Sequence, residues 1–231
     1  MMHTILSSSL MNDSILFIDK PIDWTSFDVV KKVRSVLHLR KVGHAGTLDP
    51  KATGLLILGT GSKTKELNQY VGLEKEYVGV MELGVQTPSY DSETEVIEHC
   101  PFDEISKEQI YTTAQKFVGA QTQIPPMYSA VKYGGKPLYR FARQGEELPR
   151  AERTIMIYSF DITSIALPSV DFRVVCSKGT YIRSLVNDFG NALECGATLR
   201  SLRRVRIGSF SVDSALTISA LESLVLSNRG E

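Results

Sequence analysis

Apolar residues recur at helical spacing in several parts of this chain, and polar residues mark where each helix begins. Thr25-Ser-Phe-Asp28 has the spacing of a capping box and precedes such a stretch. A second stretch follows Ser106, with Gln109 at the box position, and a third opens at Gly179. We therefore expect helices over residues 26–37, 107–118, 179–193 and 218–226.

Short apolar runs bounded by turn residues predict the strands. They are Ile15–Asp19, Leu55–Leu58, Tyr77–Leu83, Ile155–Leu167, Val170–Ser177 and Arg203–Phe210. Pro168-Ser169 supplies a turn, so the two strands beside it are expected to pair. Glycine and proline predict long loops over 41–54, 59–64 and 121–136. The mixed order of strands and helices favours one α/β domain over two.

The length of 231 residues allows one large domain or two small ones. We expect one, over 14–231. Residues 1–13 precede the first predicted strand and are expected to form a disordered leader, with Met11 as an alternative start. They lack the basic and the long apolar parts of a secretory signal.

Membrane insertion and a disulfide framework are both disfavoured. The longest aliphatic run, Leu55–Leu58, is far short of the roughly 20 apolar residues that cross a bilayer. Cys100, Cys176 and Cys195 are odd in number and have no C-x-x-C spacing, which argues against a thiolate metal site. The sequence is typical of a protein of the reducing cytoplasm.

Charge is balanced overall, with 26 Lys and Arg against 26 Asp and Glu, but it is distributed unevenly. Lys31–Lys41 holds five basic residues and no acid, and Arg200–Arg206 holds four arginines. Glu82–Glu108 carries eight acids and one base. This polarity predicts a face suited to phosphates, and the alternative is a pair of solvated surfaces.

The loop over 43–50 carries the candidate chemistry. Gly43 and Gly46 allow a tight backbone and Pro50 restrains it, so His44 and Asp49 are presented on a constrained loop. A held carboxylate can act as base or nucleophile, and the alternative is an ordinary Asp-Pro turn. The segment 59–64 resembles a phosphate loop but lacks the required glycine spacing, which disfavours nucleotide binding.

Several motifs occur together and in order. They are GHAGTLDPKATG (43–54), Lys63-Thr-Lys65, KEYVGVMELG (75–84), IPPMYSAVKYGGKPL (124–138), YRFARQG (139–145), CSKGTYIR (176–183) and LRR (202–204). Together they resemble the bacterial tRNA pseudouridine-55 synthases, the TruB family, from about residue 15 to about residue 226. The resemblance implies a pseudouridine-synthase fold of the α+β type, a mixed and mostly antiparallel central sheet flanked by helices and long loops.

The resemblance also implies the reaction. Uridine 55 in the T stem-loop of tRNA is isomerised to pseudouridine, with no cofactor and no metal. The uracil leaves its ribose through N1, turns, and rejoins through C5. Attack on C6 of the ring, and departure of uracil followed by readdition through a glycal or a sugar ester, both stay open.

Residue roles follow by similarity. Asp49 matches the nucleophile, Tyr77 the residue against the flipped ring, and Arg183 the arginine that pairs with the catalytic aspartate. His44 matches the residue that refills the base stack. The remaining expected substrate-binding residues are Tyr181, Leu202, Lys20 and Lys65. The basic helix from Lys31 and the strand with Arg200–Arg206 are then expected to contact phosphates.

The expected partner is tRNA alone, bound by a monomer without an obligatory protein partner. Many family members continue into a C-terminal RNA-binding domain of the PUA type, so this chain is expected to be a short form. Two alternatives remain. One is a guide-RNA-dependent pseudouridine synthase, and the other is an RNA-binding or tRNA-folding module whose site is dispensable.

Overall fold

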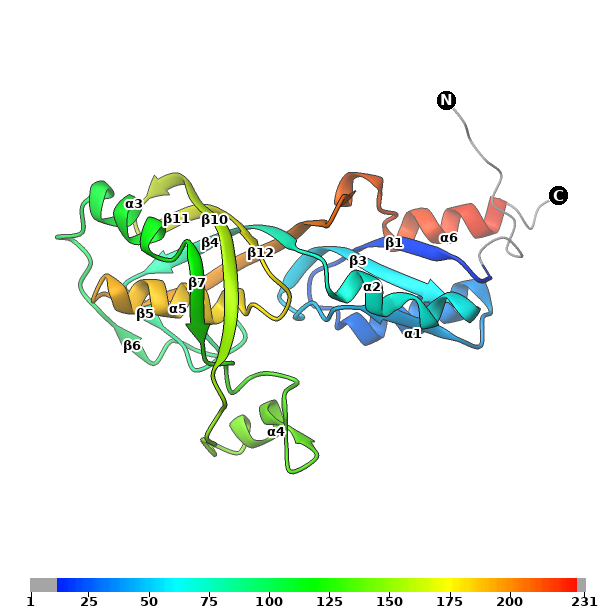
Figure 1. Cartoon of the computed structure of the whole chain (residues 1–231), viewed down its shortest axis with the longest axis horizontal. Helices are drawn as coiled ribbons and strands as arrows, with labels where there is room; N and C mark the ends of the chain where they lie inside the picture. Colours follow the sequence, from blue (N-terminus) through cyan, green and yellow to red (C-terminus); the bar gives the residue numbers. More distant parts are fainter. Residues whose placement is uncertain (1–11, 228–231) are drawn as a thin grey trace. The chain divides into compact units, whose positions relative to one another are not determined.

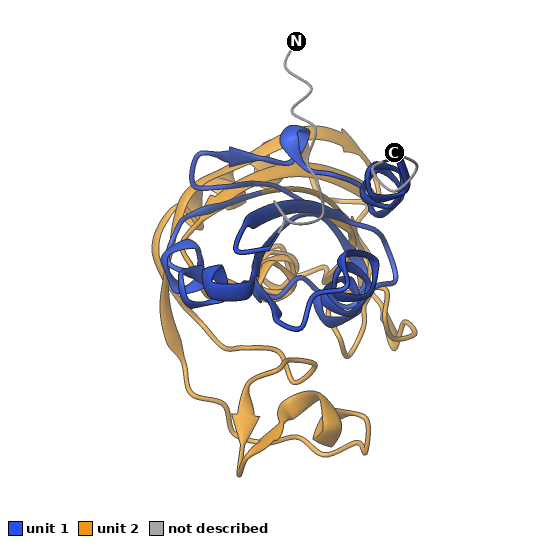
Figure 2. Ribbon diagram, turned by 90° about the vertical axis from the view of Figure 1, so that its right-hand side faces the viewer, with its two compact units in different colours: residues 1–76, 203–231 blue, residues 77–202 orange. Residues whose placement is uncertain are grey.

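A computed structural model of the chain describes residues 12–227. Residues 1–11 of the predicted leader, including Met11, lie outside the described residues. The chain divides into two compact units, coloured separately in Figure 2. Unit 1 comprises the chain up to Glu76 and from Arg203 onward, and unit 2 comprises Tyr77–Leu202. Both boundaries fall within strands rather than in a linker.

Unit 1 is a sheet with the internal order β1-β3-β12, in which β2 pairs with β3 and β13 with β12 (Figure 1). The pairs β1–β3, β2–β3 and β12–β13 are antiparallel. Its elements are β1 (Ile15–Lys20), α1 (Ser26–Leu37), β2 (Val42–Ala45), β3 (Ala52–Thr60), the 3₁₀ helix η1 (Gly61–Lys65), α2 (Leu67–Val71), β13 (Phe210–Ser211), the 3₁₀ helix η2 (Val212–Ser214) and α6 (Ile218–Ser227), with the end of β12 (Ala197–Ile207).

Both faces of the sheet of unit 1 are buried. Apolar side chains along its strands point alternately to one face and to the other. Helices α1 and α6 pack against Ile18, Leu56 and Leu58 in one core cluster. Leu55 and Ile57 belong to a second cluster with β13 and α2. Burial on both sides explains why β3 reads as a continuous apolar run.

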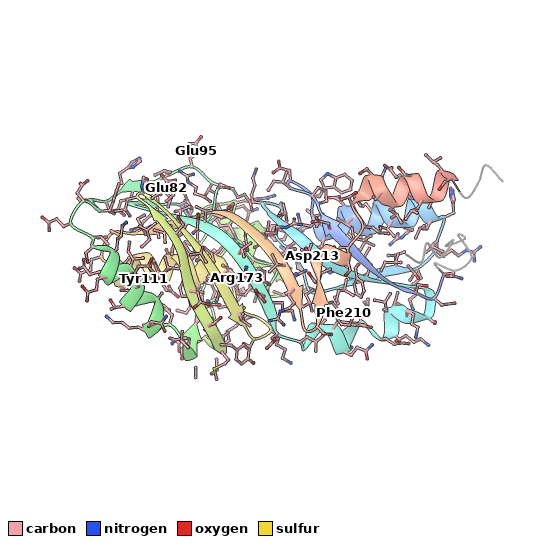
Figure 3. The ribbon with its side chains drawn as sticks, turned by 90° about the horizontal axis from the view of Figure 1, so that it is seen from above. Glu82, Glu95, Tyr111, Arg173, Phe210 and Asp213 are labelled. Atoms are coloured by element: carbon pink, nitrogen blue, oxygen red, sulfur yellow. The ribbon has the colours of Figure 1, made fainter. Side chains whose placement is uncertain are left out.

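Unit 2 is a sheet with the internal order β12-β4-β11-β10-β7. Phe117, Phe160, Phe172 and Phe189 form an aromatic core beneath it, while exposed Arg173, labelled in Figure 3, alternates with Phe172 along β11. Its elements are β4 (Lys75–Leu83), β5 (Val85–Gln86), β6 (Glu98–His99), α3 (Lys107–Lys116), β7 (Gly119–Gln123), β8 (Lys132–Tyr133), β9 (Lys136–Pro137), α4 (Leu138–Ala142), β10 (Arg153–Ala166), β11 (Ser169–Cys176), α5 (Ile182–Ala192) and much of β12.

The predicted helix starts are confirmed by their caps. Thr25 and Asp28 form a reciprocal capping box at α1, and Ser106 and Gln109 form one at α3. The paired strands β10 and β11 are also confirmed. The prediction of one long loop over 121–136 is wrong in part, because the end of β7 pairs with β10 and β8 pairs with β9. No helix among the described residues is long and apolar enough to span a membrane.

Candidate active site

Asp49 lies in the loop of unit 1 that joins β2 to β3. Asp49 is half-buried, and its backbone carbonyl accepts a hydrogen bond of 3.1 Å from the amide of Ala52. Gly46 opens the loop with a φ of 81°, in the region that glycine adopts without strain. His44 precedes the loop on β2, opposite Leu58 of β3. The strand β2 thus carries His44, and the loop that follows it carries Asp49.

Lys20 supports this loop from β1. The side chain is 0% exposed, and Nζ donates to the carbonyl oxygens of Pro21 (2.9 Å), Trp24 (2.6 Å) and Pro50 (3.3 Å). Burial lowers the pKa of Lys20 to about 8, although the charge of Asp49 acts in the opposite direction. The expectation that Lys20 touches substrate is not met in this conformation, since its ammonium is enclosed by backbone.

His44 is half-buried, and burial lowers its pKa. A backbone hydrogen bond at Gly46 opposes this shift, and the charge of Arg204 reinforces it. The imidazole is therefore neutral at pH 7. A neutral ring is the form that stacks on bases without the cost of burying a charge.

The arginines of 200–206 have partners inside the protein. Arg203 forms a two-pronged ion pair with Asp19, at 3.0 and 2.7 Å. Arg206 pairs with Glu74 and Glu76, each at 2.7 Å, and Arg200 pairs with Glu82. Arg204 is 1% exposed and donates to backbone carbonyls. The expectation that Arg204 contacts phosphate is therefore wrong, because burial removes it from solvent.

Unit 2 carries Arg183 at the start of α5. Its Nε lies 3.5 Å from Oδ2 of Asp91, and the two side chains are only 4% and 5% exposed. The other two nitrogens donate to the carbonyl oxygens of Ser89 (3.0 Å) and Tyr128 (2.8 Å). Burial with a carboxylate and two carbonyls fixes the plane of the guanidinium.

The backbone of Tyr181, the residue before α5, is bound by the side chain of Gln123. Gln123 donates to the carbonyl of Tyr181 at 3.0 Å and accepts from its amide at 2.8 Å. The guanidinium of Arg153 lies 5.3 Å from the centre of the Tyr181 ring, within the range of a cation–π contact. Tyr77 on β4 is 8% exposed, and Leu202 on β12 is half-buried.

Comparison with known proteins decides the family. A model described as TruB family pseudouridylate synthase (N terminal domain) matches residues 34–182, and one described as tRNA pseudouridylate synthase B C-terminal domain matches residues 183–231. The chain belongs to the TruB family. The resemblance seen in the motifs is thereby confirmed.

Two curated TruB relatives cover nearly the whole chain. A tRNA pseudouridine synthase B of Chloroherpeton thalassium is 50% identical over 216 residues, 91% of this chain and 90% of that protein. A protein of the same name from Flavobacterium johnsoniae is 46% identical over 219 residues, 92% of this chain and 96% of that protein. The chain is thus a TruB pseudouridine synthase by family.

The fold agrees with this assignment. A chain from the crystal structure of a Cbf5-Nop10-Gar1 complex superposes on 92% of this chain with a TM-score of 0.73 and 31% identity. This TruB chain spans about half of that longer chain, 54%. The predicted α+β class with a mostly antiparallel sheet is confirmed.

The TruB motifs do not mark every residue that shapes the site. Asp91, Gln123 and Ser26 stand outside the site residues assigned from sequence. Asp91 pairs with Arg183, Gln123 binds the backbone of Tyr181, and Ser26 binds Leu48, the residue before Asp49. Their only signal in the sequence is polarity within otherwise apolar or loop segments. Among residues 12–227, no group of three or more His, Cys, Asp or Glu side chains is arranged to hold a metal ion.

Proposed function

We propose that this TruB chain isomerises uridine 55 in the T stem-loop of tRNA to pseudouridine, with Asp49 as nucleophile. The observation that carries the proposal is the half-buried Asp49 on a loop whose Pro50 carbonyl accepts a hydrogen bond from the buried ammonium of Lys20. A carboxylate held on a restrained loop can act as a nucleophile. The two curated relatives named above are tRNA pseudouridine synthases.

The reaction begins with extrusion of the uridine, since a stacked base in folded RNA is out of reach of a side chain. Flipping costs a few kcal/mol of stacking energy. Neutral His44 refills the stack and recovers part of that cost. Asp49 then acts either at C6 of the ring or at the sugar, and the same carboxylate serves both routes.

The remaining residues bind and orient the flipped nucleoside. Tyr77 lies against the uracil ring, and Tyr181 and Leu202 supply further apolar walls. Arg183 is the proposed catalytic arginine, and its guanidinium is held in place by Asp91. Lys65, exposed at the end of η1, contacts a backbone phosphate.

The enzyme acts as a monomer on tRNA without an obligatory protein partner and without a metal, in the cytoplasm where tRNA is modified. Dependence on a guide RNA is the competing proposal, because the Cbf5 chain shares this fold. Turnover of a bare tRNA transcript by the purified chain separates the two. A guide-dependent enzyme leaves that transcript unmodified.

The test replaces Asp49 with Asn, which keeps the size of the side chain and removes its charge. Wild-type protein, Asp49→Asn and the control Asp213→Asn, an exposed aspartate on η2, are incubated with a tRNA transcript. Carbodiimide treatment and sequencing then locate pseudouridine. We expect product at position 55 with the wild type and the control only, while Asp49→Asn still binds tRNA. Full activity of Asp49→Asn contradicts the proposal.

A further inference from the structure

The loop that carries Asp49 is short and irregular, so its position depends on what holds it. It runs from Gly46 to Lys51 between β2 and β3. Free loop residues sample many conformations, whereas a nucleophile must stay within about 0.5 Å of its productive position. Contacts to the loop backbone therefore help to determine where the carboxylate lies.

Arg204 holds the first part of this loop. From β12, its guanidinium donates to the carbonyl oxygens of Gly46 (3.3 Å), Thr47 (3.4 Å) and Leu55 (2.8 Å). Only 1% of Arg204 is exposed. A planar fork of donors can reach the loop and β3 at once, which a single ammonium cannot do.

Gly54 allows the backbone of Arg204 to lie close to β3. A Cβ at Gly54 would lie 2.3 Å from the carbonyl oxygen and 2.8 Å from the amide nitrogen of Arg204. The φ of Gly54 is 105°, which disfavours any other residue. The backbone of Arg204 thus lies against β3, and its side chain extends from there to the loop.

Ser26 holds the middle of the loop. Its hydroxyl donates to the carbonyl of Leu48 at 3.1 Å and accepts from the amide of Leu48 at 2.9 Å. Ser26 is 3% exposed and is the first residue of α1, directly after the capping residue Thr25. The capped end of a helix is a rigid support, and both polar groups of Leu48 are satisfied by one side chain.

We infer that Arg204 and Ser26 are positioning residues for Asp49: they hold residues 46–48 by their backbone and so aim the carboxylate before tRNA binds. Lys20, bonded to the carbonyl of Pro50, holds the other side of Asp49. The loop is thus bound at Gly46, Thr47, Leu48 and Pro50. This inference rests on the proposed role of Asp49 as nucleophile.

A positioning role predicts a specific kinetic signature. Arg204→Met and Ser26→Ala leave the surface that binds RNA intact and release the loop, so kcat falls while KM and the affinity for a T stem-loop RNA stay within about twofold. We expect kcat to fall about a hundredfold for Arg204→Met, and about tenfold for Ser26→Ala and for Arg204→Lys, because a small misplacement of a reacting group is costly.

A control variant in the core of unit 1 separates the effect of lost stability from the effect of a released loop. Val225→Ala shortens a buried side chain on α6, which packs against α1 and does not belong to the loop network. All variants are assayed below their unfolding temperatures. Val225→Ala is expected to lose stability and keep the wild-type kcat. Amide hydrogen exchange of residues 46–49 is expected to accelerate in Ser26→Ala and Arg204→Lys, and not in Val225→Ala.

The inference is overturned if Arg204→Lys and Ser26→Ala both retain the wild-type kcat, or lose no more of it than Val225→Ala. These two variants keep the test decisive even if Arg204→Met fails to fold. Asp49→Asn, assayed alongside, distinguishes failure of the proposed function from failure of the positioning role. If Asp49→Asn is fully active, the proposed function fails; if it is inactive and the loop variants are normal, only the positioning role fails.

Discussion

Arg183 and Asp91 form an ion pair of 3.5 Å although they lie far apart in the sequence, and 5% or less of either side chain is exposed. Asp91 also accepts a hydrogen bond of 2.9 Å from the amide of Glu93. The guanidinium of Arg183 is thus oriented by a carboxylate from a loop that no catalytic motif includes.

Substitution of Asp91 with Asn is expected to lower the free energy of unfolding by about 3 kcal/mol. The change leaves the buried charge of Arg183 with less compensation, and breaking a buried pair is costly. Urea unfolding, followed by circular dichroism, measures the loss. Glu93→Gln is the control, because its ion pair with Arg143 is largely exposed and contributes at most about 1 kcal/mol. Equal stability of the two variants would contradict this account.

Lys20 makes stability depend on pH above neutrality. Its folded pKa of about 8 lies below the ordinary 10.5 because burial outweighs the charges of Asp49, Asp23 and Asp28, and Arg204 adds to the lowering. Between these two pH values the unfolded chain keeps a proton that the folded chain releases. The free energy of unfolding therefore rises with pH across that window, by at most about 3 kcal/mol.

The check compares wild type with Lys20→Met by urea unfolding from pH 7.5 to 10.5. Met has a similar length and no proton to release, so its curve lacks this contribution. The difference between the two proteins is expected to grow as pH rises through 8. Parallel curves across the whole window would show that Lys20 titrates normally.

Lys65 and Arg206 are expected to differ in their effect on tRNA binding. Lys65 is exposed at the end of η1, whereas Arg206 is neutralised by Glu74 and Glu76. Lys65→Gln should lower the slope of log K against log salt by about 0.7 to 0.9, the value of one phosphate contact. Arg206→Gln should leave the slope unchanged. Filter binding at several salt concentrations measures both, and the reverse order would refute the assignment.

Gly54→Ala is expected to prevent normal folding of unit 1. The new methyl group would meet the backbone of Arg204, and the φ of 105° is strained for alanine. A loss of more than about 3 kcal/mol is expected. Gly72→Ala is the control, since a Cβ there meets nothing within 4 Å. Thermal unfolding of both proteins provides the measurement, and similar melting temperatures would be the adverse result.

The sequence alone determined the elements whose signals are local. The capping boxes at Thr25 and Ser106 located α1 and α3, and the turn at Pro168-Ser169 located β10 and β11. The ordered series of motifs, which includes the one around Asp49, indicated the family. Such motifs are recognised from the sequence without knowledge of contacts. Caps, turns and motifs involve residues a few positions apart, so they can be read along the chain.

Only the tertiary structure decided which charges are free and which are structural. The run of arginines over 200–206 looks uniform in sequence, yet Arg203 pairs with Asp19, while Arg204 is buried against the loop of Asp49. Lys20 was expected at the substrate and is instead enclosed by carbonyls. The alternation of a strand sends neighbouring side chains to opposite faces, and partners distant in sequence then determine what each charge does.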